Sequence, residues 1–204
     1  MSQRDPAMFK SGYERRPGER YWTHPWMTDV LLRHVALPGV VWEPAVGRGD
    51  MANALAKSGR YVLESDIDIS ERPEALVHDF IGDDAEVMVD LYDVGAVVTN
   101  PPYGAMAGHF IRKALSTDVQ IVAMLLRSEF KSAGSDKRRA LFVDEPFSME
   151  ICLHTRPYWD WWLPEHDPSK KPRHNYSWFV WDRKHEGEPV IHFDRRPDET
   201  ETET

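Results

Sequence analysis

Short apolar segments that alternate with segments of helical periodicity constrain the fold of this chain more than any other feature of its sequence. Apolar runs predict strands at residues 40–43, 61–68, 75–80, 94–100 and 119–126. Apolar residues spaced three and four apart predict helices at residues 26–37, 50–59 and 107–117. Strands that are apolar throughout, with helices between them, are typical of a parallel sheet covered by helices on both faces.

Two further apolar runs, at residues 147–155 and 176–182, predict two more strands after this alternation stops. A long aromatic and basic loop at residues 156–176 joins them. The sequence therefore predicts an α/β fold with a doubly wound, mostly parallel, seven-stranded sheet. Ligands of such sheets bind beyond the carboxyl ends of the strands, close to the point where the strand order reverses.

A chain of 204 residues, 41% of them hydrophobic, is long enough for one domain with a sizeable core. We expect one domain at residues 21–193, preceded by an arm at residues 1–20 and followed by a disordered acidic tail at residues 194–204. No apolar stretch approaches the roughly 18 residues of a membrane span, and the single cysteine, Cys152, cannot form an internal disulfide. The sequence therefore predicts a cytoplasmic protein that is stabilised by packing and does not contact a membrane.

The net charge of −9 argues against a protein that coats nucleic acid indiscriminately. Basic residues nevertheless gather at residues 15–20, 131–139 and 170–173. If these segments share a face, they can bind phosphate; the alternative is three ordinary solvated loops. Nine histidines are present, but no set of four ligands has the spacing of a metal site, so we expect no bound metal.

A glycine loop follows the first predicted strand and contains Gly47 and Gly49, with Asp66 at the end of the next strand. This is a relaxed form of the dinucleotide fingerprint, in which the acid holds a ribose. Asp50, at the start of the following helix, would repel a pyrophosphate. Glu43 and Asp50 instead suit a ligand without phosphates that carries positive charge, such as an ammonium and a sulfonium. A plain strand-to-helix turn remains the alternative.

The segment "VVTNPPYGAM" at residues 97–106 is rigid, because each proline fixes its own backbone and restricts the residue before it. It holds the side-chain amide of Asn100, the carbonyl of Pro101 and the ring of Tyr103 still at the end of a strand. Asp79 and Phe80 follow a third strand and add an acceptor and a ring where an adenine would lie.

The motifs "EPAVGRGD", "SDID", "HDF" and "TNPPYG", in this order, resemble those of class I S-adenosylmethionine-dependent methyltransferases, in particular the DNA adenine-N6 methyltransferases of small phage and prophage type. The resemblance covers about residues 20–183. It implies a Rossmann-like fold, S-adenosylmethionine as cofactor, and methyl transfer to a flipped-out adenine of DNA. The large separate target-recognition domain of restriction-associated members has no room here. A homodimer or a separate specificity partner is therefore possible, with the loop at residues 156–176 as a candidate target-recognition insertion.

The site residues that the resemblance implies fall into three groups. The catalytic group is Asn100, Pro101, Pro102 and Tyr103. The cofactor-binding group is Tyr21, Thr23, Pro25, Glu43, Pro44, Ala45, Gly47, Gly49, Asp66, Ile67, Asp79, Phe80 and Asn100. The nucleic-acid-binding group, for stacking and phosphate contacts, is Lys131, Arg138, Trp159, Trp161, Lys170, Lys171 and Arg173.

The residue types of the proline motif suit transfer to a planar amine. The lone pair of adenine N6 is delocalised into the ring, and acceptance of its two hydrogens by Asn100 and Pro101 would direct that lone pair at the methyl donor. Tyr103 would stack on the base, and Pro102 would shape the turn. The same motif also serves methyltransferases that act on adenine or guanine in RNA or on a protein glutamine. An inactive nucleotide-binding module and a dehydrogenase are further alternatives.

Overall fold

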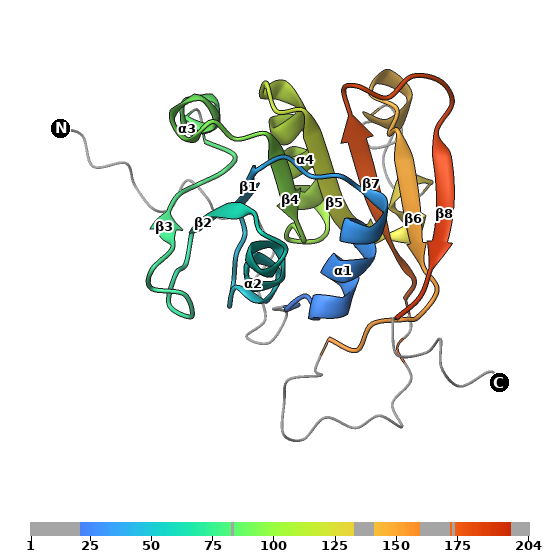
Figure 1. Cartoon of the computed structure of the whole chain (residues 1–204), viewed down its shortest axis with the longest axis horizontal. Coiled ribbons are helices and arrows are strands. Elements are labelled where there is room, and N and C mark those ends of the chain that lie inside the picture. The colour runs from blue at the N-terminus through green and yellow to red at the C-terminus, as the bar shows by residue number, and fades with distance from the viewer. Residues whose placement is uncertain (1–20, 83, 133–140, 160–171, 173, 197–204) are drawn as a thin grey trace.

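An eight-stranded β-sheet forms the centre of the described part of the chain (Figure 1). The computed structural model describes residues 21–82, 84–132, 141–159, 172 and 174–196. The strands are β1 (Val40–Glu43), β2 (Tyr61–Asp66), β3 (Leu76–Val77), β4 (Ala96–Thr99), β5 (Ile121–Arg127), β6 (Met149–Leu153), β7 (Tyr176–Asp182) and β8 (Val190–Asp194). Their order across the sheet is β3-β2-β1-β4-β5-β7-β6-β8.

The strand directions confirm the predicted mostly parallel sheet. β3, β2, β1, β4 and β5 are parallel neighbours, β7 is antiparallel to both β5 and β6, and β8 is parallel to β6. Only β7 therefore runs against the rest of the described sheet, as its arrow in Figure 1 shows. The carboxyl ends of the other strands meet at one edge, which carries the predicted site residues.

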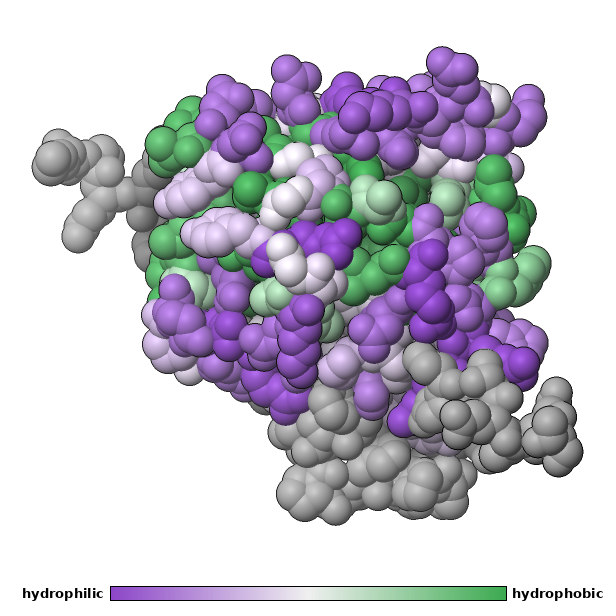
Figure 2. Space-filling model, in the orientation of Figure 1, coloured by the Kyte–Doolittle hydropathy of each residue, from purple (hydrophilic) through white to green (hydrophobic). Residues whose placement is uncertain are grey.

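The predicted count of seven strands was too low, because β8 was not recognised. β8 is an edge strand, and its residues Val190, Ile191 and Phe193 are 40%, 52% and 75% exposed. A short, exposed strand between polar segments needs no long apolar run, so the sequence did not indicate it. Figure 2 shows hydrophobic atoms along the right margin, where β8 lies in Figure 1.

Helices cover both faces of the sheet, as the doubly wound architecture requires. They are α1 (Pro25–His34), α2 (Asp50–Lys57), α3 (Ala85–Tyr92) and α4 (Ala105–Ser116). α1 and α2 bury Met27, Leu31 and Leu55 in one core cluster. α3 and α4 bury Val89 and Ile111 in a second cluster on the other side of the sheet. Within the described ranges, no helix is long and apolar enough to span a bilayer.

Helix α3 was not predicted from the sequence. Its exposed face carries Val87 and Leu91, which are 62% and 70% exposed, while Ala85 and Val89 face the core. Apolar residues on both faces obscure the helical period, so the pattern did not stand out. Beside it, the strand predicted at residues 75–80 shortens to the two-residue, exposed β3 at the sheet edge.

Contacts between α1 and the last strands hold the amino-terminal segment in place. The indole nitrogen of Trp178, on β7, donates to the carbonyl of Met27 at 2.8 Å. Both residues are fully buried. Because α1 begins at Pro25, this contact also fixes the direction of residues 21–24, which approach the carboxyl edge of the sheet.

Asp194 was assigned to the disordered tail, but it ends β8 and binds α1. Its carboxylate accepts hydrogen bonds from Arg33 Nε at 3.0 Å and lies 2.8 Å from His34 Nε2. Burial alone would raise the pKa of Asp194, but the hydrogen bonds from Arg33 and His34 outweigh it and lower the pKa to about 2. The domain therefore extends at least through β8.

Asp194→Asn is expected to lower the free energy of unfolding by about 2 kcal/mol at pH 7. The folded pKa is depressed below the ordinary value of 3.8, so the stabilisation is present above about pH 4 and is lost as the pH falls through about 2. Urea unfolding of both proteins across this range measures the difference. Asp29→Asn, an exposed change on α1, is the matched control and should have little effect. A difference that does not depend on pH would contradict the assignment.

Candidate active site

The strand order brings the predicted site residues to one crevice. β1 and β4 are neighbours, while the chain passes from β1 outward to β2 and β3 before it returns. The order therefore reverses between β1 and β4, where ligands of such sheets bind. Glu43 is the last residue of β1, Asp66 is the last of β2, and Asn100 follows β4 directly.

The glycine loop between β1 and α2 contains two glycines in left-handed backbone conformations. Gly47 and Gly49 have φ values of 51° and 87°, which favour glycine. A Cβ atom at Gly49 would lie 2.9 Å from the guanidinium of Arg72. The N–H of Gly47 donates to Asp66 Oδ2 at 3.0 Å, so the end of β2 supports the loop. Pro44 is buried and Ala45 is half-buried in the same turn.

Glu43 is a buried carboxylate among other acids. It is 3% exposed, and its Oε2 atom has no hydrogen-bond partner among the described residues. Burial raises the pKa of Glu43 well above its usual value, and the nearby charges of Glu64 and Asp66 act in the same direction. The guanidinium of Arg72 pairs directly with Glu64, at 2.6 Å. A cationic ligand would stabilise the ionised form of Glu43.

The side-chain amide of Asn100 is oriented by the segment that precedes α1. Its Nδ2 atom donates to the carbonyl of Tyr21 at 2.9 Å and to Thr23 Oγ1 at 3.2 Å. Because both of these partners are acceptors, the amide atom that faces them is the nitrogen. The Oδ1 atom is buried and accepts no hydrogen bond from the part of the chain that the structure describes. A buried acceptor without a partner is costly, so it is poised for a donor from a ligand.

Sequence reasoning placed Tyr21, Thr23 and Pro25 around the cofactor. The structure gives the first two a different contact, because they bind the amide of Asn100. Thr23 is 5% exposed, and Pro25 begins α1. A contact between residues 77 and 79 positions apart has no signal in a single sequence.

Four rings form an aromatic cluster beside Asn100: Tyr21, Tyr103, Trp159 and Tyr176. The ring centroids of Tyr103 and Tyr21 are 5.0 Å apart, and those of Tyr103 and Tyr176 are 6.0 Å apart. Trp159 lies 4.9 Å from Tyr176. Tyr176 is 2% exposed, and its place in the cluster was missed because β7 enters the sheet between β5 and β6.

The electrostatic surroundings of Tyr103 keep its hydroxyl neutral. Burial raises the pKa of Tyr103 well above its usual value and Tyr176 adds to this, while the neighbouring Asn100 amide has a smaller opposite effect. The guanidinium of Arg127, at the end of β5, lies 5.9 Å from the centre of the Tyr103 ring. Arg127 was not predicted; the signal that could have found it is a cation at the end of an apolar strand.

Two apolar residues of the predicted cofactor-binding group differ in exposure. Ile67 follows β2 and is 56% exposed, so its side chain offers apolar surface at this edge. Phe80 is 1% exposed, and its ring packs against Trp42 and Phe110 at centroid distances of 4.9 and 5.2 Å. The structure therefore places Phe80 in the core. Asp79 Oδ1 accepts a hydrogen bond from the N–H of Ile81 at 3.1 Å.

Only two of the predicted nucleic-acid-binding residues, Lys131 and Trp159, lie in the described part of the chain. Lys131 forms an ion pair with Glu150, a β6 residue that is 1% exposed, so its charge is already balanced inside the protein. Trp159 belongs to the aromatic cluster. The remaining predictions of this group lie outside the described residues: Arg138, Trp161, Lys170, Lys171 and Arg173. Pro101 is buried and Pro102 half-buried after β4.

Comparison with known proteins identifies the fold. No protein-family model matches the sequence, and no curated protein matches it. A solved structure assigned as the modification subunit of a type I restriction enzyme from Vibrio vulnificus YJ016 is similar, with a TM-score of 0.57 and 13% identity. The similarity covers 88% of this chain and 48% of that one. This chain thus spans about half the length of that subunit.

Two further structures are similar at 15% identity. A protein of Pyrococcus horikoshii assigned as an RNA methyltransferase has a TM-score of 0.52, with 78% of this chain and 80% of that chain covered. A DNMT2 mutant of Spodoptera frugiperda has a TM-score of 0.50, with coverages of 77% and 55%. The fold is the Rossmann-like fold of class I methyltransferases. At these identities the similarity establishes the fold alone.

Proposed function

We propose that this protein is an S-adenosylmethionine-dependent methyltransferase that acts on the N6 amino group of adenine in DNA. The observation that carries the proposal is the amide of Asn100. Its nitrogen is held by Tyr21 and Thr23, and its Oδ1 atom remains buried without a partner. An acceptor fixed in this way suits a planar amine, which presents N–H donors.

The residues around the glycine loop fit the proposed cofactor. S-adenosylmethionine supplies a methyl group bound to a positively charged sulfur. The buried Glu43 carboxylate, with Oε2 free, suits the ammonium of the methionine part. Asp66 lies beside Gly47 and suits the ribose hydroxyls, and the exposed Ile67 suits one face of the adenine. A dinucleotide fits less well, because its pyrophosphate would approach Glu43 and Asp50.

Residues of the proline motif bind the base that accepts the methyl group. Asn100 Oδ1 accepts one N–H of the adenine amino group, and the Pro101 carbonyl accepts the other. This holds the nitrogen with its lone pair directed at the donor, so a carbon–nitrogen bond forms as the carbon–sulfur bond breaks. The neutral Tyr103 ring stacks on the base, and the surplus proton of the amine leaves to solvent. Flipping of the base out of a duplex, or presentation in a single strand, is required.

RNA bases and protein glutamine are the alternative methyl acceptors, after adenine in DNA. Proteins of this fold include one assigned as an RNA methyltransferase, so the fold does not select the substrate. The choice of adenine in DNA depends on the resemblance of the motifs around Asn100. Recognition of a target sequence by a partner subunit or a second copy is part of the same proposal, since one similar structure is a subunit of a restriction enzyme.

Transfer of labelled methyl from S-adenosylmethionine tests the proposal. The full chain is incubated separately with duplex DNA, single-stranded DNA, RNA and a protein mixture, and the products are digested to nucleosides or amino acids. N6-methyladenine from DNA is expected. Label in RNA or glutamine would contradict the substrate, and absence of cofactor binding would contradict the enzyme class.

A further inference from the structure

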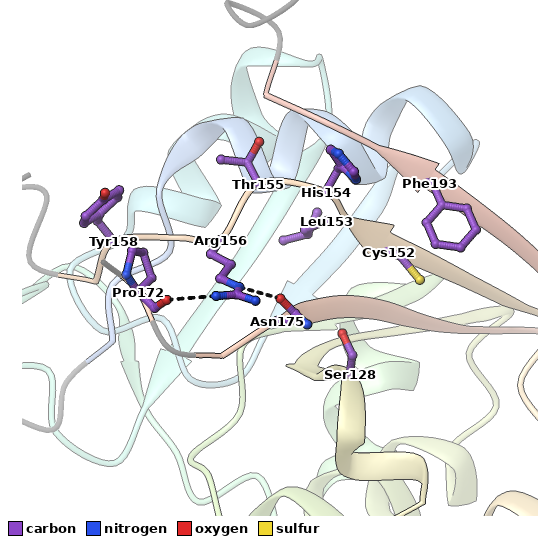
Figure 3. A pocket seen from close by; sticks show the side chains of 10 residues that line it. All are labelled: Ser128, Cys152, Leu153, His154, Thr155, Arg156, Tyr158, Pro172, Asn175 and Phe193. Carbon is purple, nitrogen blue, oxygen red and sulfur yellow. Dashed lines mark hydrogen bonds between the residues drawn. The ribbon is translucent and has the colours of Figure 1, made fainter. Parts of the chain in front are cut away.

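A second cavity lies at the same edge of the sheet, and its lining residues Tyr158 and Asn175 are the sequence neighbours of Trp159 and Tyr176 in the aromatic cluster. Its volume is about 770 Å³, and none of the proposed cofactor or catalytic residues lines it. Figure 3 shows the side chains that line it, among them Ser128, Cys152, Arg156, Tyr158, Asn175 and Phe193. They come from the ends of β5 and β6, the start of β7 and the edge strand β8.

This cavity shares a wall with the candidate active site. Ser128 follows Arg127, and Asn175 precedes Tyr176, so alternate residues serve the two sites. The N–H of Ser128 donates to the carbonyl of Asn175 at 3.0 Å. The candidate active site and the second cavity are therefore neighbours, where the end of β5 meets the start of β7.

Arg156 gives the cavity a fixed positive charge. Its Nε atom donates to Asn175 Oδ1 at 2.7 Å, and its Nη1 atom donates to the carbonyl of Pro172 at 3.5 Å (Figure 3). Both acceptors are neutral, so they orient the guanidinium without balancing its charge. The Nη2 donors make no hydrogen bond to the described residues and suit an anion such as a phosphate.

Phe193 gives the cavity an aromatic surface. It is 75% exposed and lies opposite Cys152 in the pairing of β8 with β6. A ring so exposed in the wall of a cavity is available to stack on a ligand. An exposed aromatic ring and an unbalanced arginine that line one cavity are the combination that binds single-stranded nucleic acid, through base stacking and phosphate contact.

We propose that this cavity binds a nucleotide of the substrate strand that flanks the target adenine. The flanking base stacks on Phe193, and its phosphate contacts Arg156. The inference rests on the proposed function, because it requires a nucleic-acid strand at Asn100. It assigns a binding role to β8, the strand added outside β6.

The test measures binding of a fluorescein-labelled, single-stranded oligothymidylate with one central adenine to the full-length chain. Phe193→Ala is expected to weaken binding about tenfold, the loss of one stacked base, without changing the salt dependence. Arg156→Gln should reduce the slope of log K against log salt by about 0.7, the loss of one phosphate contact. Ile191→Ala, on the same strand, and Arg112→Gln, on α4, are the matched controls and should have little effect.

A strand with an abasic position next to the adenine identifies the stacked base. It should bind wild type about tenfold more weakly, whereas Phe193→Ala should lose little further affinity. Cofactor binding by each variant reports that it is folded. If wild type binds the strand and both cavity variants bind equally well, the inference is wrong. If wild type binds no DNA at all, the proposed function itself fails, which is a distinct result.

Discussion

Asn100→Ala is expected to lower kcat for methyl transfer about 100- to 1,000-fold, the effect of removing one preorganised hydrogen-bond partner of a reacting group. The buried Oδ1 atom is the partner in question. Binding of S-adenosylmethionine, measured by calorimetry, should change much less, since Glu43 and the glycine loop remain. A variant that retains wild-type kcat would exclude Asn100 from catalysis.

Thr23→Val tests how far the orientation of the Asn100 amide matters, because it leaves the amide itself in place. The substitution removes one of the two acceptors of Asn100 Nδ2 but leaves the carbonyl of Tyr21. We expect kcat to fall about fivefold with KM for DNA little changed, as the loss of about 1 kcal/mol predicts. Thr23→Ser retains the hydroxyl and should restore most of the rate. Equal rates for Thr23→Val and wild type would show that the amide needs no support from Thr23.

Glu43→Gln is expected to weaken binding of S-adenosylmethionine by about 2–3 kcal/mol, or roughly 30- to 150-fold, because it removes a buried charge that pairs with a cation. Titration calorimetry at neutral pH measures this change. Glu74→Gln is the matched control, because Glu74 is 62% exposed and neighbours the same Arg72. Unchanged affinity in Glu43→Gln would contradict the proposed ammonium contact.

The same substitution should stabilise the unliganded protein. The pKa of Glu43 is raised above 4.5 by burial and by Glu64 and Asp66, so the folded state binds more protons than the unfolded state above pH 4.5. Stability is therefore lost as the pH rises from about 4.5 through the raised pKa. Urea unfolding should show this loss in wild type and its absence in Glu43→Gln. A variant that binds the cofactor more weakly but is more stable without it would show that Glu43 serves binding. A purely structural carboxylate would not give this combination.

The elements that form the candidate site were predicted well because they are buried. β1, β4 and β5 are almost entirely apolar, and each appears in the sequence as a continuous run. The elements that were missed, α3 and β8, expose apolar side chains to solvent and so lack a one-sided pattern. Lys131 was expected at phosphate and is paired with the buried Glu150, which the local sequence does not indicate.

The sequence by itself determined the α/β architecture and the positions of Glu43, Asp66 and Asn100 at strand ends, because strand and helix patterns and turn residues are local properties of the chain. The tertiary structure decided which atoms of these residues remain available. The contacts of Tyr21 and Thr23 with Asn100 join segments far apart in the chain. The insertion of β7 between β5 and β6 brings Tyr176 to Tyr103, and β8 places Phe193 in the wall of the cavity that Arg156 also lines. These contacts depend on sheet order and side-chain packing, which no local pattern encodes.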